Sequence, residues 1–169
     1  MQITINEETI DYTLEAEKGL GEVVDGISTW LNQAGLTIRK IRKDSTELEL
    51  TEQTDWREEP LEEVSQLEIE AVTPWELFQE KLAAVTEYFN MLENSLEDDI
   101  KSAANLFEEA PAVSQLLNDC IHPDLGNRFN REVGELIDSS QIEQRKDELR
   151  ELAKILRVIA AERLRETVD

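Results

Sequence analysis

The amino-acid sequence predicts an α+β fold, in which strands and one helix precede a region made only of helices. Three observations lead to this prediction. Apolar and polar residues alternate in residues 1–14, which is the pattern of a strand with one buried face. In residues 20–34 the apolar residues recur at helical spacing, and from residue 73 onward the helical period dominates. We therefore expect two domains, residues 1–72 and residues 73–169.

The first element is predicted to be a β-hairpin followed by a helix. A polar turn at residues 6–8 separates the alternating apolar residues, which are Ile3, Ile5, Ile10, Tyr12 and Leu14. The helical pattern that begins at Leu20 ends before Gly35, a residue type that commonly terminates helices. The chain is therefore expected to open with two strands and one helix.

The next elements are predicted to be further strands. Residues 36–43 and 46–51 are rich in alternating apolar residues and are expected to join near Asp44 and Ser45. A short helical turn is expected after Pro60, followed by a last strand. On that strand one face carries Leu67, Ile69 and Ala71.

This order of elements resembles the ubiquitin-like β-grasp fold, in which a hairpin, a long helix, further strands and a helical turn precede a central last strand. The resemblance is carried by "MQITI", by "PLEEVSQLEIEAV", and by the helix residues Val23, Val24, Ile27, Trp30 and Leu31. It covers about two fifths of the chain. Conjugated modifiers and sulfur carriers with this fold end in a free Gly-Gly, whereas this chain continues into a helix. We therefore expect neither covalent tagging nor sulfur transfer, and the fold alone implies no single function.

The second region is predicted to contain four or five helices. Thr73, Pro74 and Glu76 have the spacing of a capping box with proline at the first helical position. The first helix either runs to Ala110 or breaks near Ser95, which could cap a second segment. The expected helices that follow begin at Pro111, extend over residues 124–138 after Pro123 ends the preceding helix, and run from Ser139 or Ser140 to about residue 166.

An apolar stripe with alternating spacings of three and four runs along the first helix of this region. We call it the helical seam; it consists of Trp75, Phe78, Leu82, Val85, Phe89, Leu92 and Leu96. Full burial of each side chain would gain roughly 1.5–3 kcal/mol, so the seam needs a partner. The closing helix is apolar over a wide arc in residues 152–164 and can supply one within the chain. A homodimer through the same surfaces, or a foreign helix, stays open.

The one concentrated positive segment consists of Arg39, Lys40, Arg42 and Lys43. It is too small, within a strongly acidic half of the chain, to predict a nucleic-acid site. An edge strand that uses charge to prevent unwanted pairing is the favoured interpretation, and a docking spot for an acidic peptide stays open. These four residues are therefore candidates for binding a protein partner.

The three tryptophans receive different predictions. Trp30 is expected in the core, on the apolar face of its helix. Trp75 is expected where the helical region meets the sheet. Trp56 lies in a polar loop, and two interpretations stay open: an exposed anchor for a partner, or a cover over the end of the sheet.

No catalytic, metal or cofactor site is predicted. Cys120 and His122 lie close together, but they are the only cysteine and histidine in the chain, and a zinc site needs about four ligands. The acidic residues of "ENSLEDDIK" do not follow a calcium-loop spacing and are interpreted as a solvated helix face. Glycine-rich phosphate loops, a serine nucleophile elbow, HExxH and paired CxxC are absent from the sequence.

The charge of the chain narrows the classes of function. There are 39 acidic and 17 basic residues, and the whole excess of 22 lies in residues 1–140, since residues 141–169 hold seven of each sign. Such a charge argues against binding to nucleic-acid backbones or anionic lipids. With one cysteine, no secretory leader and no long apolar run, we expect a cytoplasmic protein.

The leading interpretation is a cytoplasmic, bacterial, non-enzymatic protein that acts as an adaptor by binding protein partners. The edge of its sheet or the Trp56 loop, together with the helical seam, would provide the binding surfaces, and the closing helix could form a homodimer. One alternative is an acidic decoy that mimics nucleic acid and occupies a basic surface of another protein. Another alternative is an enzyme that uses carboxylates, which would need a polar pocket with strongly shifted acids.

Overall fold

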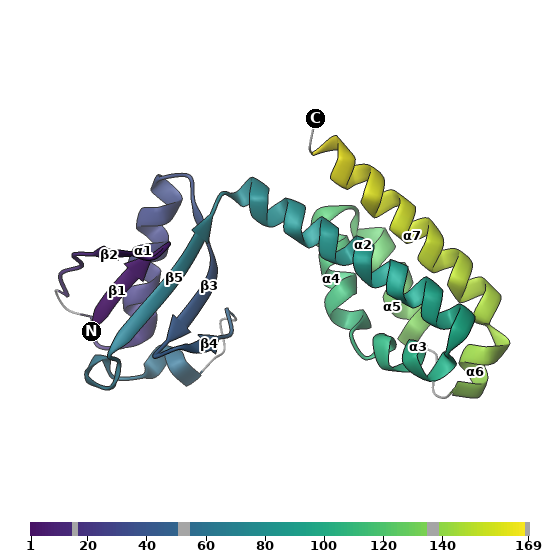
Figure 1. Cartoon of the computed structure of the whole chain (residues 1–169), viewed down its shortest axis with the longest axis horizontal. Coiled ribbons are helices and arrows are strands. Elements are labelled where there is room, and N and C mark those ends of the chain that lie inside the picture. Colours follow the sequence, from purple (N-terminus) through teal and green to yellow (C-terminus); the bar gives the residue numbers. More distant parts are fainter. Residues whose placement is uncertain (15–16, 51–54, 135–138, 168–169) are drawn as a thin grey trace. The chain divides into compact units, whose positions relative to one another are not determined.

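The computed structural model describes residues 1–14, 17–50, 55–134 and 139–167 (Figure 1). The chain divides into two compact units, Met1–Leu77 and Phe78–Asp169, which we call the N-terminal unit and the helical unit. The predicted α+β class is confirmed, because a five-stranded mixed sheet precedes a region of helices.

The sheet of the N-terminal unit has the strand order β2-β1-β5-β3-β4. Its strands are β1 (Gln2–Ile5), β2 (Glu8–Ile10), β3 (Thr37–Lys43), β4 (Thr46–Leu48) and β5 (Gln66–Val72). β1 and β5 run parallel, and the other neighbouring strands are antiparallel. Helix α1 (Leu20–Gln33) lies against one face of this sheet (Figure 1). The sheet and the helix share one core, to which the strands contribute Ile3, Ile5, Ile41, Leu67, Ile69 and Ala71.

Both hairpins of the sheet turn through residues with positive φ. These are Asn6 (50°) and Glu7 (69°) in the first turn, and Asp44 (47°) and Ser45 (70°) in the second. Two-residue turns of this kind match the right-handed twist of the strands, at a conformational cost for residues other than glycine. The predicted turn at Asp44 and Ser45 is thus confirmed.

Two predictions for the N-terminal unit are wrong. The second strand was expected to continue to Leu14 but ends at Ile10. Beyond it the Tyr12 hydroxyl lies against α1 at Gly26, where an added Cβ would be 2.6 Å away. Trp30 was expected in the core but is 55% exposed. The buried face of α1 includes Ile27 and Leu31, and adjacent helical residues point about 100° apart, so Trp30 is turned outward.

The helical unit contains the larger part of α2 and five further helices among the described residues. The helices are α2 (Pro74–Asp98), α3 (Ile100–Phe107), α4 (Ala110–Cys120), α5 (Pro123–Gly134), α6 (Ser139–Gln144) and α7 (Lys146–Glu166). The predicted capping box is confirmed: the Thr73 amide donates to Glu76 Oε2 at 2.8 Å, and the Glu76 amide donates to Thr73 Oγ1 at 3.2 Å.

Two helix ends differ from the predictions. The first helix breaks at Asp99 and not at Ser95, because the Asp99 carboxylate accepts from the Lys101 amide at 3.0 Å and caps α3. The closing helix is divided at Arg145, whose backbone is not helical and whose guanidinium donates to Glu132 at 2.5 Å. Of the helix expected over 124–138, residues 135–138 lie outside the described residues.

The core of the helical unit contains most of the helical seam. Val85, Phe89, Leu92 and Leu96 pack in one cluster with the inner face of α7, which contributes Leu149, Ala153, Leu156 and Ala160. Phe89 and Phe129 meet edge to face, with ring centroids 5.1 Å apart. The first seam residue departs from the expected pattern, since Trp75 is 53% exposed. The packed part of the seam therefore lies further along α2 than its sequence spacing predicted.

Gly126 allows α4 and α5 to approach closely. A Cβ at this position would lie 2.1 Å from the backbone oxygen of Ser114 and 2.2 Å from Oδ1 of Asn118. Neither distance is compatible with a side chain, so this helix crossing depends on glycine.

Candidate protein-binding surface of the sheet

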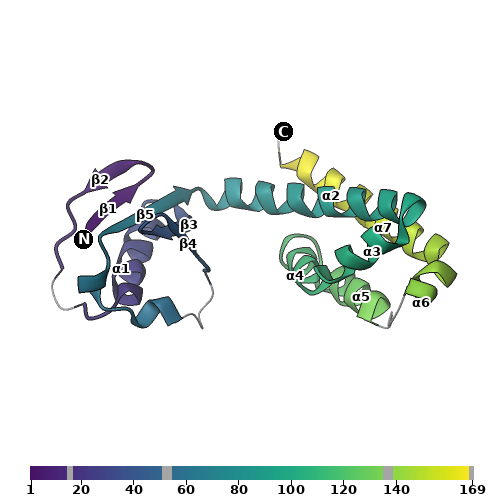
Figure 2. The ribbon, with the colours of Figure 1, turned by 60° about the horizontal axis from the view of Figure 1, so that its bottom comes forward.

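One face of the sheet is left uncovered by α1 (Figure 2). We call it the open sheet face; the groove along it is lined by Thr4, Asn6, Glu7, Lys40, Arg42, Gln66, Glu68, Ile69 and Glu70. The groove has a volume of about 690 Å³. It is the main candidate for a functional site in the N-terminal unit.

The strand period places charged residues on this face. Successive strand residues point to opposite sides, so the burial of Leu67, Ile69 and Ala71 turns Glu68 and Glu70 outward. The fully buried Ile41 likewise places its neighbours Lys40 and Arg42 on the open sheet face. The apolar residues of β3 and β5 point into the core, and the charged residues that alternate with them therefore point to the open sheet face.

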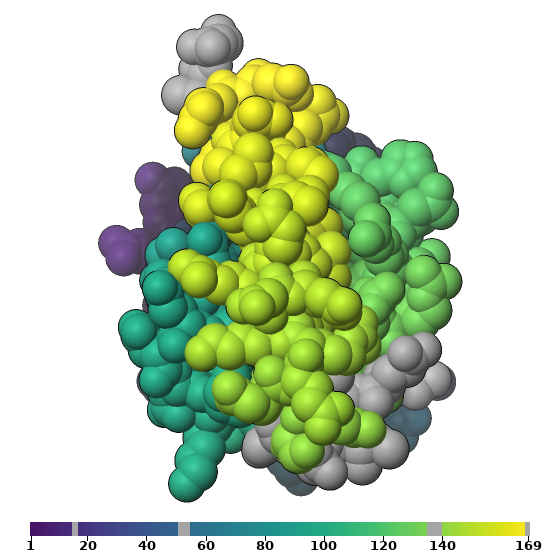
Figure 3. All heavy atoms as spheres, turned by 90° about the vertical axis from the view of Figure 1, so that its right-hand side faces the viewer, coloured from purple at the N-terminus to yellow at the C-terminus, as the bar shows by residue number. Residues whose placement is uncertain are grey.

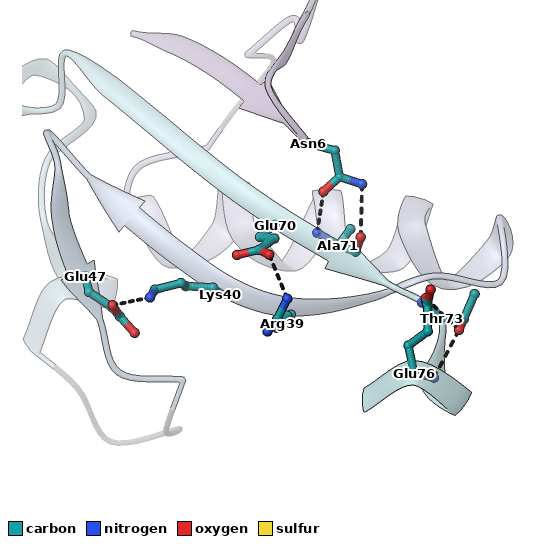
Figure 4. Close-up of polar contacts among 8 residues, drawn as sticks. All are labelled: Asn6, Arg39, Lys40, Glu47, Glu70, Ala71, Thr73 and Glu76. Carbon is teal, nitrogen blue, oxygen red and sulfur yellow. Dashed lines mark hydrogen bonds and ion pairs between the residues drawn. The ribbon is translucent and has the colours of Figure 1, made fainter. Parts of the chain in front are cut away.

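Acidic residues neutralise the three cations on and beside the open sheet face. Lys40 Nζ lies 2.5 Å from a Glu47 oxygen, and Arg42 Nη1 lies 3.7 Å from a Glu68 oxygen. The register of β3 against β5 shifts between Ile38 and Lys40, at Arg39. Nη1 of Arg39 donates to Glu70 at 2.8 Å, as Figure 4 shows. The result is a surface on which both signs alternate at short range.

Lys43 follows Arg42 on β3 and therefore points to the opposite face of the sheet. Its ammonium donates to Glu59 at 2.5 Å, and this hydrogen bond raises the pKa of Lys43. β3 lies between β5 and β4, but β4 pairs only with Ile41, Arg42 and Lys43. The interpretation of the β3 cations as guards of an edge strand is therefore wrong for Arg42 and Lys43, and it stays a prediction for Arg39 and Lys40, which precede the segment paired with β4. All four cations connect neighbouring strands and turns within the N-terminal unit.

Asn6 forms the end of the groove. Its Oδ1 accepts from the amide of Ala71 at 2.8 Å, and its Nδ2 donates to the carbonyl of Ala71 at 2.9 Å (Figure 4). The side chain thus extends the β1–β5 pairing by one step beyond Ile5. Asn6 was not among the predicted site residues, and the only signal in the sequence is an asparagine in a turn, a residue type that tolerates positive φ.

Trp56, one of the predicted partner contacts, lies inside the N-terminal unit and is only 7% exposed. Its Nε1 donates to the carbonyl of Glu49 at 2.9 Å, and the Arg57 guanidinium lies 5.4 Å from the centre of its ring. Arg57 in turn donates to both carboxylate oxygens of Asp25 at 2.6 Å, which ties this turn to α1. Trp56 is therefore not an exposed anchor for a partner, and its burial agrees with the other interpretation, in which it covers the end of the sheet.

Cys120 and His122 do not face a common site. The Cys120 thiol is buried, and desolvation raises its pKa, which disfavours the reactive thiolate. The His122 side chain is 63% exposed, and its Nδ1 accepts from the Asp124 amide at 3.2 Å, at the start of α5. In the described part of the chain, no three His, Cys, Asp or Glu side chains are placed to hold a metal ion.

Three carboxyl groups have lowered pKa values, each for a structural reason. Hydrogen bonds from Thr73 lower the pKa of Glu76, and hydrogen bonds from Ser102 and Lys101 lower that of Asp99. A hydrogen bond from Arg145 lowers the pKa of Glu132. These shifts stabilise the charged carboxylates, which is the direction expected for caps and ion pairs and opposite to that of a general acid.

Comparison with known families gives one result for the N-terminal region. Residues 1–73, which include the whole sheet, match the family model described as the TP0873 N-terminal domain. Neither the curated proteins nor the solved structures contain a significant match to the chain. Among the described residues, no helix combines the length and the apolar character needed to cross a membrane.

Proposed function

We propose that this protein is a non-enzymatic binding protein whose N-terminal unit recognises a protein partner through the open sheet face. The observation that carries the proposal is the groove of about 690 Å³ on a sheet face that α1 leaves uncovered. Cations and carboxylates alternate along it, so it suits a protein surface that also carries both signs.

The strand order supports a ubiquitin-like β-grasp arrangement for residues 1–72. In that arrangement a parallel pair of the first and last strands lies at the centre, with a hairpin on each side and one helix across one face. The order β2-β1-β5-β3-β4 and the parallel pairing of β1 with β5 agree with it. We propose that the chain uses this scaffold to present a rigid, charged surface.

A mixed surface is favoured over an acidic peptide as the ligand of this face. Lys40, Arg42 and Arg39 each already lie near a carboxylate. A purely acidic ligand would have to displace Glu47, Glu68 or Glu70, whereas a partner with both signs can add to the existing pairs. Exposed pairs of this kind contribute only about 0–1 kcal/mol each, so they leave the face free to exchange partners.

The test is site-specific photo-crosslinking of the full chain inside cells, with the crosslinking residue at position 40 or 42. A matched control carries it at Lys101, an exposed cation on α3 of the helical unit. We expect one partner to be captured from positions 40 and 42 and not from 101. With the captured partner purified, Arg42→Glu should weaken binding about tenfold or more, and Lys101→Glu should leave it unchanged. Capture that is absent at 40 and 42, or equal at 101, contradicts the proposal.

A second candidate function is an acidic decoy that occupies a basic surface of another protein. Its support is the net charge of −22, together with the pairing of all four β3 cations, Arg39, Lys40, Arg42 and Lys43, to carboxylates. Binding of this kind weakens steeply between about 0.05 and 0.2 M salt. Binding to the captured partner that is insensitive to salt would exclude the decoy and leave the open sheet face as the proposal.

The third alternative, an enzyme that uses carboxylates, gains no support. It needs an acid whose pKa is raised within a polar pocket. Among the described residues, three carboxyl groups have shifted pKa values, and all three pKa values are lowered. These groups belong to two helix caps and an ion pair. We therefore do not propose it.

A further inference from the structure

Helix α7 has an outer face that is apolar and exposed. Its inner face is buried in the helical core, whereas Ile155 is 47% exposed and Val158 is 41% exposed. Ile159 is half-buried on the same side, and Leu152, also half-buried, borders this side and packs in part against the helical core. We call these four residues the outer face of α7. Among the described elements, α7 is the only one with two large exposed apolar residues within one turn.

The charge of α7 differs from that of the rest of the protein. It contains five acidic and six basic residues, within a chain whose net charge is −22. Figure 3 shows α7 along the surface of the helical unit, in yellow and yellow-green. The helix therefore presents an apolar strip on a nearly neutral element of a strongly anionic protein.

Three of the five carboxylates of α7 lie near cations of the same helix or of the residue before it. The distances from the side-chain nitrogen to the carboxylate oxygen are 3.9 Å for Lys154 and Glu151, and 2.9 Å for Arg163 and Glu166. For Arg145 and Glu148 the distance is 3.3 Å. An approaching surface therefore meets little net charge beside the apolar strip.

The neighbouring flank, which faces α2, is neutralised in the same way. Arg150 donates to Glu97 at 2.6 Å, and Arg157 donates to Glu93 at 2.9 Å. These cations remove the charge of two carboxylates that would otherwise repel an anionic neighbour.

We propose that a second copy of this chain covers the outer face of α7, with α7 packed against α7 across a twofold axis. Two bodies that each carry −22 repel one another over most of their surfaces, and the repulsion is smallest where both are neutral. The same patch then serves both partners, as an isologous interface requires. A helix of 21 residues is about 31 Å long, which gives room for a helix-to-helix contact on each side of the axis.

Charge also distinguishes a second copy from other occupants. A strongly acidic or strongly basic partner would gain no attraction from a balanced face. A second copy gains burial of apolar residues from both chains. The interface is separate from the open sheet face, so failure of one proposal leaves the other standing.

The first test is the mass of the full chain in solution, measured by sedimentation equilibrium at several concentrations in about 0.05 M and about 0.5 M salt. The monomer has a mass of 19.4 kDa, and we expect a species of twice that mass at the higher concentrations. Dimerisation should be stronger at high salt, because screening reduces the repulsion between the two anionic bodies. A monomer at every concentration in high salt overturns the proposal and leaves the face to a foreign helix. A dimer that weakens with salt also overturns it, since it would depend on ionic contacts.

The second test uses a matched pair of variants. The double variant Ile155→Glu and Val158→Glu places charge on the outer face of α7, and we expect it to weaken dimerisation at least tenfold. The control is Met91→Glu, which changes a 42% exposed apolar residue on α2. Circular dichroism verifies that both variants keep the fold. A dimer that survives the double variant, or that Met91→Glu disrupts equally, contradicts the α7 interface.

Discussion

The N-terminal unit combines an apolar core with polar side chains that bind the backbone of distant residues, whereas the core of the helical unit is built mainly by apolar and aromatic packing. Asn6 makes two hydrogen bonds to the backbone of Ala71, and Asp44 Oδ1 accepts from the amides of Ser65 and Gln66. In the helical unit, aromatic rings link separate helices: the ring centroids of Phe89 on α2 and Phe129 on α5 lie 5.1 Å apart. The two units thus depend on different interactions.

The difference follows from how each architecture satisfies its backbone. A helix pairs its own amides and carbonyls, so its side chains are free to pack. A sheet of short strands leaves backbone groups at strand ends and turns that need partners from elsewhere in the chain. Substitutions that change volume should therefore act most in the helical unit, and substitutions that remove polar atoms in the N-terminal unit.

The largest effect is expected for Phe89→Ala. This fully buried ring contacts Tyr88 and Phe129, and its removal should lower the free energy of unfolding by about 3–5 kcal/mol. Urea unfolding, monitored by circular dichroism, measures this loss of stability. Met91→Ala on the same helix should cost little. All three tryptophans lie in the N-terminal unit, so their fluorescence reports on that unit. If the fluorescence transition shifts as much as the helical signal, the comparison between the units fails.

A smaller loss is expected for Asn6→Ala. The variant leaves the amide and carbonyl of Ala71 without their side-chain partners and places alanine at a φ of 50°. We expect a loss of about 1–3 kcal/mol in the free energy of unfolding, measured by urea unfolding with tryptophan fluorescence as the signal, since all three tryptophans lie in the N-terminal unit. Gln2→Ala removes a single exposed hydrogen bond to Thr9 and should cost less. Equal losses for the two variants would show that the Asn6 contacts have no special weight.

A gain is expected for Ser45→Gly. The φ of 70° at this position disfavours any residue with a Cβ, so glycine should raise the free energy of unfolding by about 0.5–1 kcal/mol. Thermal unfolding of the N-terminal unit measures it. The matched control Ser45→Ala keeps the Cβ and should bring no gain. Equal stabilisation by alanine would refute strain at this turn.

The smallest effect is expected for the pH dependence of the helical unit. Arg145 lowers the pKa of Glu132 in the folded state, so this pair adds stability above the unfolded pKa, and that stability is lost as the pH falls through the folded pKa. Unfolding midpoints between pH 3 and pH 7 should therefore change less with pH in Glu132→Gln than in the parent protein. Glu143→Gln, at a carboxyl group exposed on α6, serves as the control. Identical pH profiles for the parent protein and Glu132→Gln would contradict a contribution of the Glu132–Arg145 pair to stability.

Several features of the fold follow from local sequence alone. The period of β5 places Leu67, Ile69 and Ala71 on one face, and the structure buries all three. The capping box of Thr73 and Glu76 joins residues three positions apart, so its chemistry is complete within one turn of helix. Only the cations of the candidate surface could be predicted, because they follow one another in β3. Their carboxylate partners, Glu47, Glu68 and Glu70, lie on other strands and meet them only in the folded sheet.

What tertiary structure decided is which side of each element is covered and which distant residues meet. Periodicity predicted that Trp30 lies on the buried apolar face of its helix, but the arc of α1 that the sheet covers leaves this side chain exposed. The turn at Trp56 is buried, and the absence of a side chain at Gly21 lets Arg57 lie against α1. Asn6 and Ala71 are 65 residues apart, and the close approach at Gly126 depends on how α4 crosses α5. A sequence determines contacts within one turn or one strand through bond geometry, whereas contacts between elements depend on how complete surfaces pack together.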